Sequence, residues 1–80
     1  MTIGAAVRLR ILELCDMHGI SPNKLCRISG VTQSTVNNII NQRNKSTTVS
    51  TLKKLCDGLN ITSQDFFNSE LFENLEQELK

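Results

Sequence analysis

Five side chains that carry amide or hydroxyl groups fall within six consecutive residues near the middle of this chain. They are Gln33, Ser34, Thr35, Asn37 and Asn38. Such groups donate and accept hydrogen bonds, and a glutamine or asparagine amide forms paired bonds to the edge of an adenine base. An ordinary solvated helix face would carry mostly glutamate and lysine, which favour helix formation more than asparagine, serine and threonine do. We therefore interpret these residues as base-contacting groups.

A short amphipathic helix can present these groups to a ligand. Val36, Ile39 and Ile40 recur at helical spacing among the polar residues, and they predict the buried face of a helix over residues 33–41. Thr32 directly precedes this segment, and threonine is a favourable N-cap residue. The sequence thus predicts a helix that is apolar on one side and dense in neutral hydrogen-bonding groups on the other.

A second short helix is predicted just before this one. Ser21 suits its N-cap and Pro22 its first position, while Leu25 and Cys26 supply a buried face. Gly30 marks its end, because glycine adopts the left-handed conformation there without a steric penalty at Cβ. Two short amphipathic helices joined by such a turn have the spacing of a DNA-binding helix-turn-helix.

The chain resembles the Cro/repressor type of helix-turn-helix domain, which includes lambdoid phage repressors and many small bacterial regulators. Leu25, Gly30, Val31, Val36 and Ile39 fall on the core pattern of that family, and the later ITSQDFF is similar to its closing helix. The resemblance extends over about residues 7–67. It implies an all-α, five-helix, lambda-repressor-like fold in which Gln33, Ser34, Thr35 and Asn38 contact bases.

The chain departs from the family pattern at several positions. Pro22 stands where the family commonly has a phosphate-contacting glutamine, so we expect that contact to pass to Asn23. Cys26 stands where a small alanine is usual. Asn41 is followed by Gln42 instead of glycine, and Thr47 replaces a frequent proline. These departures leave the predicted fold intact and alter the predicted contacts to phosphate.

Charge is distributed unevenly along the chain, although the formal net charge is only +1. Residues 1–64 hold eight basic and three acidic residues, whereas residues 65–80 hold one basic and five acidic residues. A basic surface attracts nucleic-acid phosphates without regard to sequence. The residues predicted to contact phosphate are Asn23, Lys24, Arg27, Thr32, Asn41, Arg43 and Lys45.

The complete pattern predicts five helices and allows a sixth. The first spans residues 3–18 with Val7, Ile11 and Leu14 as its core stripe, and the fourth spans residues 49–57 and stops at Gly58 and Asn60. The predicted buried residues of that fourth helix and its end are Val49, Leu52, Leu55, Cys56 and Leu59. The fifth opens with a capping-box sequence, TSQD, at residues 62–65. We expect a DNA-binding domain over residues 1–69 and an acidic amphipathic helix over residues 70–80.

Two apolar stripes remain after the core has been assigned, and they leave two alternatives open. One stripe lies on the first helix and the other in the tail; they comprise Ala5, Leu9, Leu12, Leu71 or Phe72, Leu75 and Leu79. Either the tail folds back onto the first helix within one monomer, or the stripes form a dimer interface. A twofold dimer would suit a protein that binds two DNA half-sites.

Other classes of protein find little support in the sequence. No apolar run approaches the roughly 20 residues of a membrane span, and no signal peptide is visible, so we expect a cytoplasmic protein. Cys15, Cys26 and Cys56 are widely spaced, which argues against a disulfide framework or a zinc site. Cys26 and Cys56 lie beside leucines on apolar helix faces, which predicts buried free thiols, whereas the sequence leaves open whether Cys15 is redox-active. His18 is expected to interact with the end of the first helix instead of acting as a base. We expect no enzyme activity, cofactor, metal or small-molecule substrate.

The prediction from sequence is therefore a transcriptional regulator, and specifically a repressor, that binds double-stranded DNA as a homodimer through the helix at residues 33–41. The alternative is a protein-interaction module on the same scaffold, such as an antitoxin-like or complex-assembly subunit. The low net charge and acidic tail favour that alternative slightly.

Overall fold

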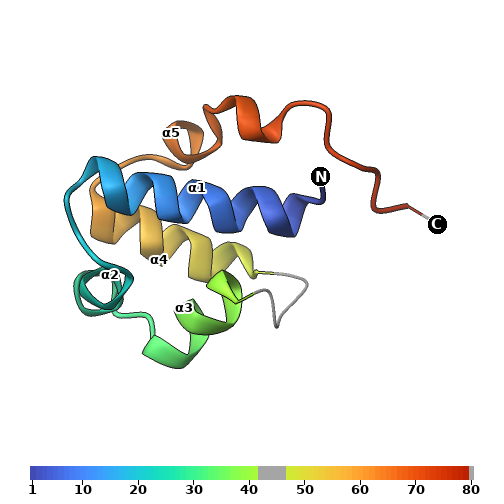
Figure 1. The fold of residues 1–80 in the computed structure, drawn as a ribbon. Helices are drawn as coiled ribbons and strands as arrows, with labels where there is room; N and C mark the ends of the chain where they lie inside the picture. Colours follow the sequence, from blue (N-terminus) through green and yellow to red (C-terminus); the bar gives the residue numbers. More distant parts are fainter. Residues whose placement is uncertain (42–46, 80) are drawn as a thin grey trace.

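The computed structural model describes residues 1–41 and 47–79, and this part of the chain contains only helices and connecting segments. The elements are α1 (Ile3–Met17), α2 (Pro22–Ser29), α3 (Gln33–Ile40), α4 (Val49–Leu59), α5 (Ser63–Phe67) and the 3-10 helix η1 (Glu70–Phe72). In Figure 1, α1 crosses the middle of the molecule, with α2 and α3 on one side and α5 and η1 on the other. Helix α4 contacts both α2 and α5. The predicted all-α, five-helix fold is confirmed.

The helices begin where the sequence predicts, because hydroxyl side chains cap their first turns. The side chain of Thr32 accepts a hydrogen bond from the Thr35 amide, and that of Ser21 accepts one from the Lys24 amide. Thr62 and Asp65 form both bonds of the predicted capping box at α5. Such bonds satisfy amides that have no partner within the helix. They also fix where each short helix starts.

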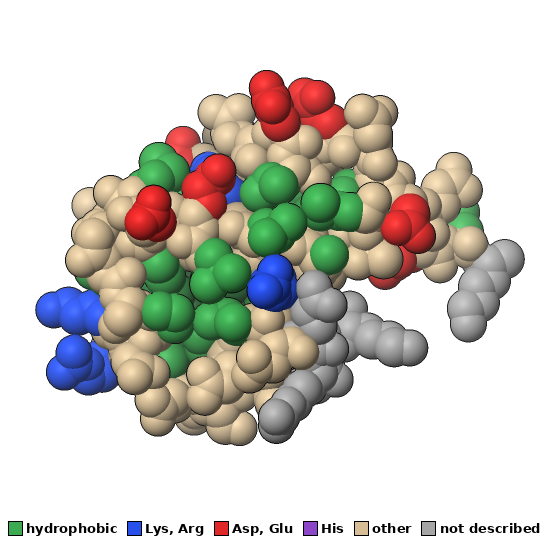
Figure 2. All heavy atoms as spheres, in the orientation of Figure 1, with side chains coloured by type: hydrophobic (Ala, Val, Ile, Leu, Met, Phe, Trp, Pro, Cys, Tyr) green, Lys and Arg blue, Asp and Glu red, His purple; other side chains and the backbone are tan. Residues whose placement is uncertain are grey.

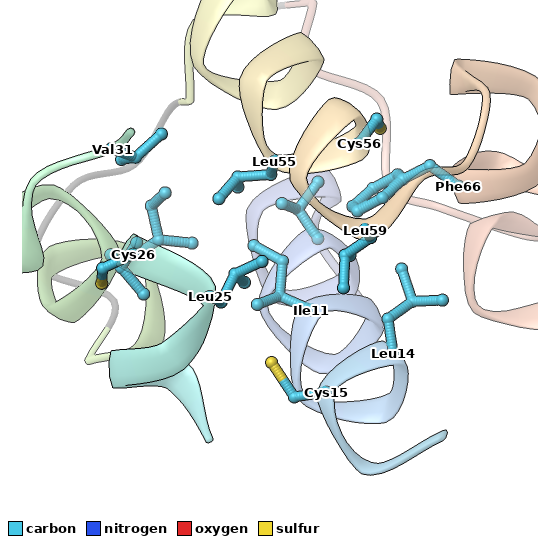
Figure 3. Close-up of a cluster of buried hydrophobic side chains, with 13 residues drawn as sticks. Ile11, Leu14, Cys15, Leu25, Cys26, Val31, Leu55, Cys56, Leu59 and Phe66 are labelled. Carbon is cyan, nitrogen blue, oxygen red and sulfur yellow. The ribbon is translucent and has the colours of Figure 1, made fainter. Parts of the chain in front are cut away.

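The core lies where helices α1, α2 and α4 meet α5. Ile11 of α1, Leu25 of α2, Leu55 of α4 and Phe66 of α5 are all fully buried. Figure 3 shows the labelled side chains of these four helices converging on one another. The predicted core stripe of α1 is buried as expected. The burial of this apolar surface holds the helix-turn-helix on the rest of the molecule.

Helix α4 is longer than predicted because Gly58 lies within it. The helix continues to Leu59 and ends at Asn60, which adopts the left-handed conformation with φ 57°. A Cβ atom at Gly58 would lie 2.8 Å from Cα of Ser29, at the crossing of α2 and α4. The expectation that Gly58 stops the helix is therefore wrong. This glycine allows two helices to approach closely, and Asn60 alone provides the predicted stop.

Val49 is also placed differently from the prediction. Its side chain is 83% exposed because Val49 is the first residue of α4 and points away from the core. Leu52, one turn later, is partly buried and packs against the core. The buried face of α4 thus begins one turn after its first residue.

A helix is expected over residues 70–80, but the described part of this segment, residues 70–79, contains η1 followed by a turn and irregular backbone. Asn74 has φ 57°, a left-handed conformation that breaks a helix, and a helix of this length gains little stability without packing. Phe72 packs against the core, with its ring centroid 6.0 Å from Phe66 and 4.8 Å from Phe67. The Glu76 amide donates to the Met1 carbonyl over 3.0 Å. The tail of this monomer therefore folds back onto the N-terminal part of the chain.

Candidate nucleic-acid interface

The turn between α2 and α3 has the geometry that the sequence predicts. Gly30 adopts the left-handed conformation with φ 71°, and its amide donates to the Cys26 carbonyl over 3.1 Å. Val31 follows with a buried side chain, and Thr32 returns to extended backbone as the N-cap of α3. Because Leu25 and Val36 are fully buried on either side of the turn, the two helices are held as one rigid unit.

Helix α3 turns its polar face away from the core. Gln33, Ser34 and Asn37 are exposed, and Thr35 and Asn38 are partly buried. Thr35 has a structural role as well, because its amide donates to the Thr32 hydroxyl and its own hydroxyl lies 2.8 Å from the same oxygen. The side chains most open to a ligand are thus those of the first turn and of Asn37.

A side-chain hydrogen bond joins the first turns of the two helices. The Gln33 amide nitrogen donates to the Asn23 amide oxygen over 2.6 Å. This pairing leaves the Gln33 oxygen free to accept and the Asn23 nitrogen free to donate. The sequence suggested each residue as a contact to DNA but did not predict that they bond to one another. The bond orients Gln33 before any ligand arrives.

Charged side chains are unevenly distributed over the surface. In Figure 2, Lys and Arg side chains project at the edge beside α2 and a further basic side chain lies near the middle of the face, whereas Asp and Glu side chains lie over the α5 and η1 side and over α1. The two basic residues of α2, Lys24 and Arg27, are both exposed. Asn41 is the exposed C-cap of α3. Arg43 and Lys45, also predicted to contact phosphate, lie outside the residues that the structure describes.

The three cysteines are buried free thiols. Burial raises the pKa of the Cys15, Cys26 and Cys56 thiols above the ordinary value of 9.0, so each is protonated at neutral pH. His18 Nδ1 lies 2.9 Å from the Leu14 carbonyl at the end of α1, as expected. Within residues 1–41 and 47–79, no three metal-binding side chains are grouped to hold an ion.

Two arginines of α1 make long-range contacts that the sequence did not predict. Arg10 is buried, and its guanidinium donates to the carbonyls of Asp65 and Phe66 at 2.7 Å each and pairs with Glu13. Arg8 donates through Nε to the Ile40 carbonyl over 2.6 Å. An arginine among the core positions of a helix could have signalled a buried partner. The identity of the partners could not be predicted, because the Ile40 and Phe66 carbonyls lie 32 and 56 residues away along the chain from the arginines that bind them.

A capped α3 with a polar outer face, braced by α2 across a left-handed glycine, defines a helix-turn-helix DNA-binding domain. The profile of the Cro/C1-type HTH DNA-binding domain matches residues 10–70, and the chain belongs to this family. The structure resembles the crystal structure of the prophage Lp1 protein 11, with a TM-score of 0.79 and 33% sequence identity. The match covers 86% of this chain and 91% of that one. No curated protein matches the chain.

None of the described helices is long and apolar enough to span a membrane, and the longest, α1, has 15 residues.

Proposed function

We propose that this protein is a sequence-specific transcriptional regulator, and specifically a repressor, that inserts α3 into the major groove of DNA. The observation that carries the proposal is the exposed amide and hydroxyl face of α3, presented by a rigid helix-turn-helix. Gln33 and Ser34 stand at its N-terminal end, the part of a recognition helix that contacts base edges in this class of domain. Repression would follow when the bound protein occludes a promoter.

Base contacts and phosphate contacts have separate roles in this proposal. Gln33, Ser34, Thr35, Asn37 and Asn38 supply the base-contacting face. Gln33 enters the groove already held by Asn23, so its oxygen is fixed for a donor on a base edge, such as the adenine amino group. Because little side-chain freedom is lost on binding, such a contact discriminates between bases more strongly.

The proposed phosphate contacts surround this face. Lys24 and Arg27 of α2 supply charge, and Asn23 donates through its free amide nitrogen. Thr32 and Asn41, at the two ends of α3, are proposed to bond to phosphate with neutral groups. Arg43 and Lys45 remain proposed contacts from the segment that follows α3.

We propose that the active form is a homodimer. Half-sites in this class of complex lie about one helical turn, 34–36 Å, apart on the same side of the DNA. The chain measures 36 × 24 × 20 Å along its principal axes. Two copies side by side can therefore span an inverted repeat of this spacing. A single α3 of eight residues contacts too few bases to select one site in a genome.

Selection of bound duplexes from a random DNA pool, with the purified chain at near-physiological salt, tests the function. An enriched inverted repeat with half-site centres about one turn apart supports the dimeric regulator. An enriched single half-site supports DNA recognition by a monomer and contradicts the dimer. If the folded protein enriches no sequence, the regulator is contradicted and the alternative below is favoured.

The base-contacting face is tested by Gln33→Ala combined with Ser34→Ala. We expect a loss of about 5- to 150-fold in the preference for the selected site over a site with one altered base pair, because a good paired contact contributes about 1–3 kcal/mol. The control is Arg27→Met, which should weaken binding to all duplexes about equally and lower the salt slope by about one unit. Unchanged preference in the double variant would remove these two residues from the base contacts.

The alternative function is a protein-interaction module on the same scaffold. Val49 is 83% exposed and Phe67 is 41% exposed, and both line a hollow whose other apolar walls are Ile3, Val7 and Leu52. Exposed apolar groups of this kind often mark protein contacts. The selection experiment separates the two functions, because an interaction module enriches no DNA sequence.

A further inference from the structure

Helix α3 depends on contacts from other elements for its position. It has eight residues, most of them moderate or poor helix formers, and a helix this short is marginal alone. Its N-terminal end is fixed by the Thr32 cap and by the bond between Asn23 and Gln33. Its C-terminal end has no basic residue in the last turn, and its C-cap, Asn41, is not left-handed. The two usual devices for closing a helix at this end are absent from α3 itself.

Arg8 supplies what the C-terminal end of α3 lacks. Its Nε donates to the carbonyl of Ile40, the last residue of α3, over 2.6 Å, and the contact is partly buried. In the described part of the chain, this is the side-chain hydrogen bond that joins α1 to α3. A cation near a helix C-terminus also interacts favourably with the helix dipole. Arg8 therefore caps α3 from a different helix.

We propose that Arg8 is a positioning residue for DNA recognition. It holds the C-terminal end of α3 in a fixed position and orientation relative to α1. The effect of Arg8 on DNA recognition rests on the proposed function. Its effect on the position of α3 in the free protein rests only on the hydrogen bond to Ile40. Arg8 binds the Ile40 carbonyl at the C-terminal end of α3, and Asn23 binds Gln33 at its N-terminal end. The base-contacting face between these two residues of α3 is therefore held at both ends.

Two other roles for Arg8 give different results. A phosphate-contacting arginine contributes to binding of every duplex and to the salt slope. An arginine that only stabilises the fold lowers the unfolding midpoint and leaves recognition by the folded protein unchanged. A positioning residue changes the discrimination between sites, because a misplaced α3 weakens contacts that depend on exact distances, and it leaves the salt slope unchanged.

The test compares Arg8→Met and Arg8→Lys with the wild-type chain at a temperature where all three are folded. Methionine keeps an apolar stem of similar length and removes the donor and the charge. We expect Arg8→Met to reduce the preference for the selected site over a one-base-pair variant by about tenfold, the effect of losing one charged hydrogen bond. Lysine can still donate to a helix carbonyl, and we expect it to restore part of that preference.

The salt dependence of DNA binding, compared between Arg8→Met and Arg27→Met, shows whether Arg8 contacts phosphate instead. Arg27→Met should lower the salt slope by about one unit, and Arg8→Met should leave it unchanged. A lower slope in Arg8→Met with unaltered site preference would overturn the proposal in favour of a phosphate contact. A lower unfolding midpoint with both slope and preference unchanged would overturn it in favour of a purely structural role.

A measurement on the free protein separates failure of this inference from failure of the proposed function. Amide hydrogen exchange followed by NMR reports opening of the last turn of α3. We expect Arg8→Met to speed exchange at the amides of Ile39, Ile40 and Asn41 by about tenfold relative to those in the middle of α1. This result requires no DNA. Unchanged protection at these amides would overturn the positioning role even if the chain proves to be a sequence-specific regulator.

Discussion

Arg10 shows at the scale of one residue how a charge is accommodated inside this small core. The residue is only 8% exposed, and its guanidinium bonds to two carbonyls, those of Asp65 and Phe66, and to the Glu13 carboxylate. A buried charge is tolerated only when its donors have partners. Arg10 thereby ties α5, which carries the central Phe66, to α1.

We predict that Arg10→Met lowers the free energy of unfolding by about 3 kcal/mol, because it leaves two carbonyls without their charged donor. Urea denaturation followed by circular dichroism measures the change. The matched control is Arg27→Met, an exposed arginine whose loss should change stability by less than about 0.5 kcal/mol. If the two substitutions lowered the free energy of unfolding equally, the buried contacts of Arg10 would contribute no more to stability than an exposed arginine does.

The buried thiols predict a dependence of stability on alkaline pH. Burial, with a smaller contribution from the Asp57 charge, raises the pKa of the Cys56 thiol above its ordinary value of 9.0. The folded state therefore holds this proton more tightly than the unfolded state. The resulting stabilisation is complete below pH 9.0 and is lost as pH rises through the raised pKa.

Unfolding by urea at several values from about pH 8 to about pH 11 tests this dependence. We expect the stability of the wild-type chain to fall more steeply with pH than that of Cys56→Ala. The comparison uses slopes, because the alanine variant also loses packing and is less stable at every pH. Parallel slopes would show that the Cys56 thiol keeps an ordinary pKa in the folded protein.

At the scale of the elements, the crossing of α2 and α4 depends on Gly58. Alanine is the better helix former by about 1 kcal/mol, so a glycine inside α4 needs a reason. The reason is the space at the crossing, where a Cβ atom would lie 2.8 Å from both Cα and Cβ of Ser29. The two helices approach so closely that only a hydrogen atom fits.

We predict that Gly58→Ala lowers the free energy of unfolding by about 1–3 kcal/mol, because the cost of overpacking exceeds the gain in helix propensity. Thermal and urea denaturation measure the change. Ser50→Ala, at an exposed position near the start of the same helix, is the control and should be neutral or slightly stabilising. A stabilised Gly58→Ala protein would mean that α2 and α4 can separate at no cost.

Local signals predicted most of the elements from the sequence. Apolar periodicity, a Ser or Thr cap and a left-handed glycine or asparagine lie within a few residues of the helix ends they determine, as with Thr32 before α3 and Thr62 before α5. Gly58 misled the prediction, because its role depends on Ser29, which lies 29 positions earlier in the chain. The tail misled it too, since Asn74 breaks a pattern that otherwise favours a helix.

The candidate site was predictable residue by residue but not as an arrangement. The residue types of Gln33 and Asn23 suggested contacts to DNA, whereas their hydrogen bond follows from the angle between α2 and α3. Arg8 was counted only as a positive charge, because nothing near it in the sequence points to Ile40. Side chains that connect elements distant in sequence are visible only once the helices are packed.

At the scale of the whole molecule, charge is separated into a basic body and an acidic tail. The tail glutamates Glu73, Glu76 and Glu78 are exposed, and Glu76 lies 3.5 Å from the Met1 ammonium. An exposed pair of this kind adds little stability. The larger effect of these carboxylates is on the field around the protein, because they offset the attraction of the body for phosphate.

We predict that neutralising the tail by Glu73→Gln, Glu76→Gln and Glu78→Gln together strengthens binding to any duplex several-fold at low salt and speeds association. The difference should vanish at high salt, because the Debye length falls from about 30 Å at 0.01 M to about 3 Å at 1 M. Fluorescence anisotropy with a random-sequence duplex across this range measures the effect. Gln77→Glu is the control of opposite sign and should weaken binding at low salt. If both variants bind as the wild-type chain does at 0.01 M salt, the tail lies too far from the bound DNA for its charge to act.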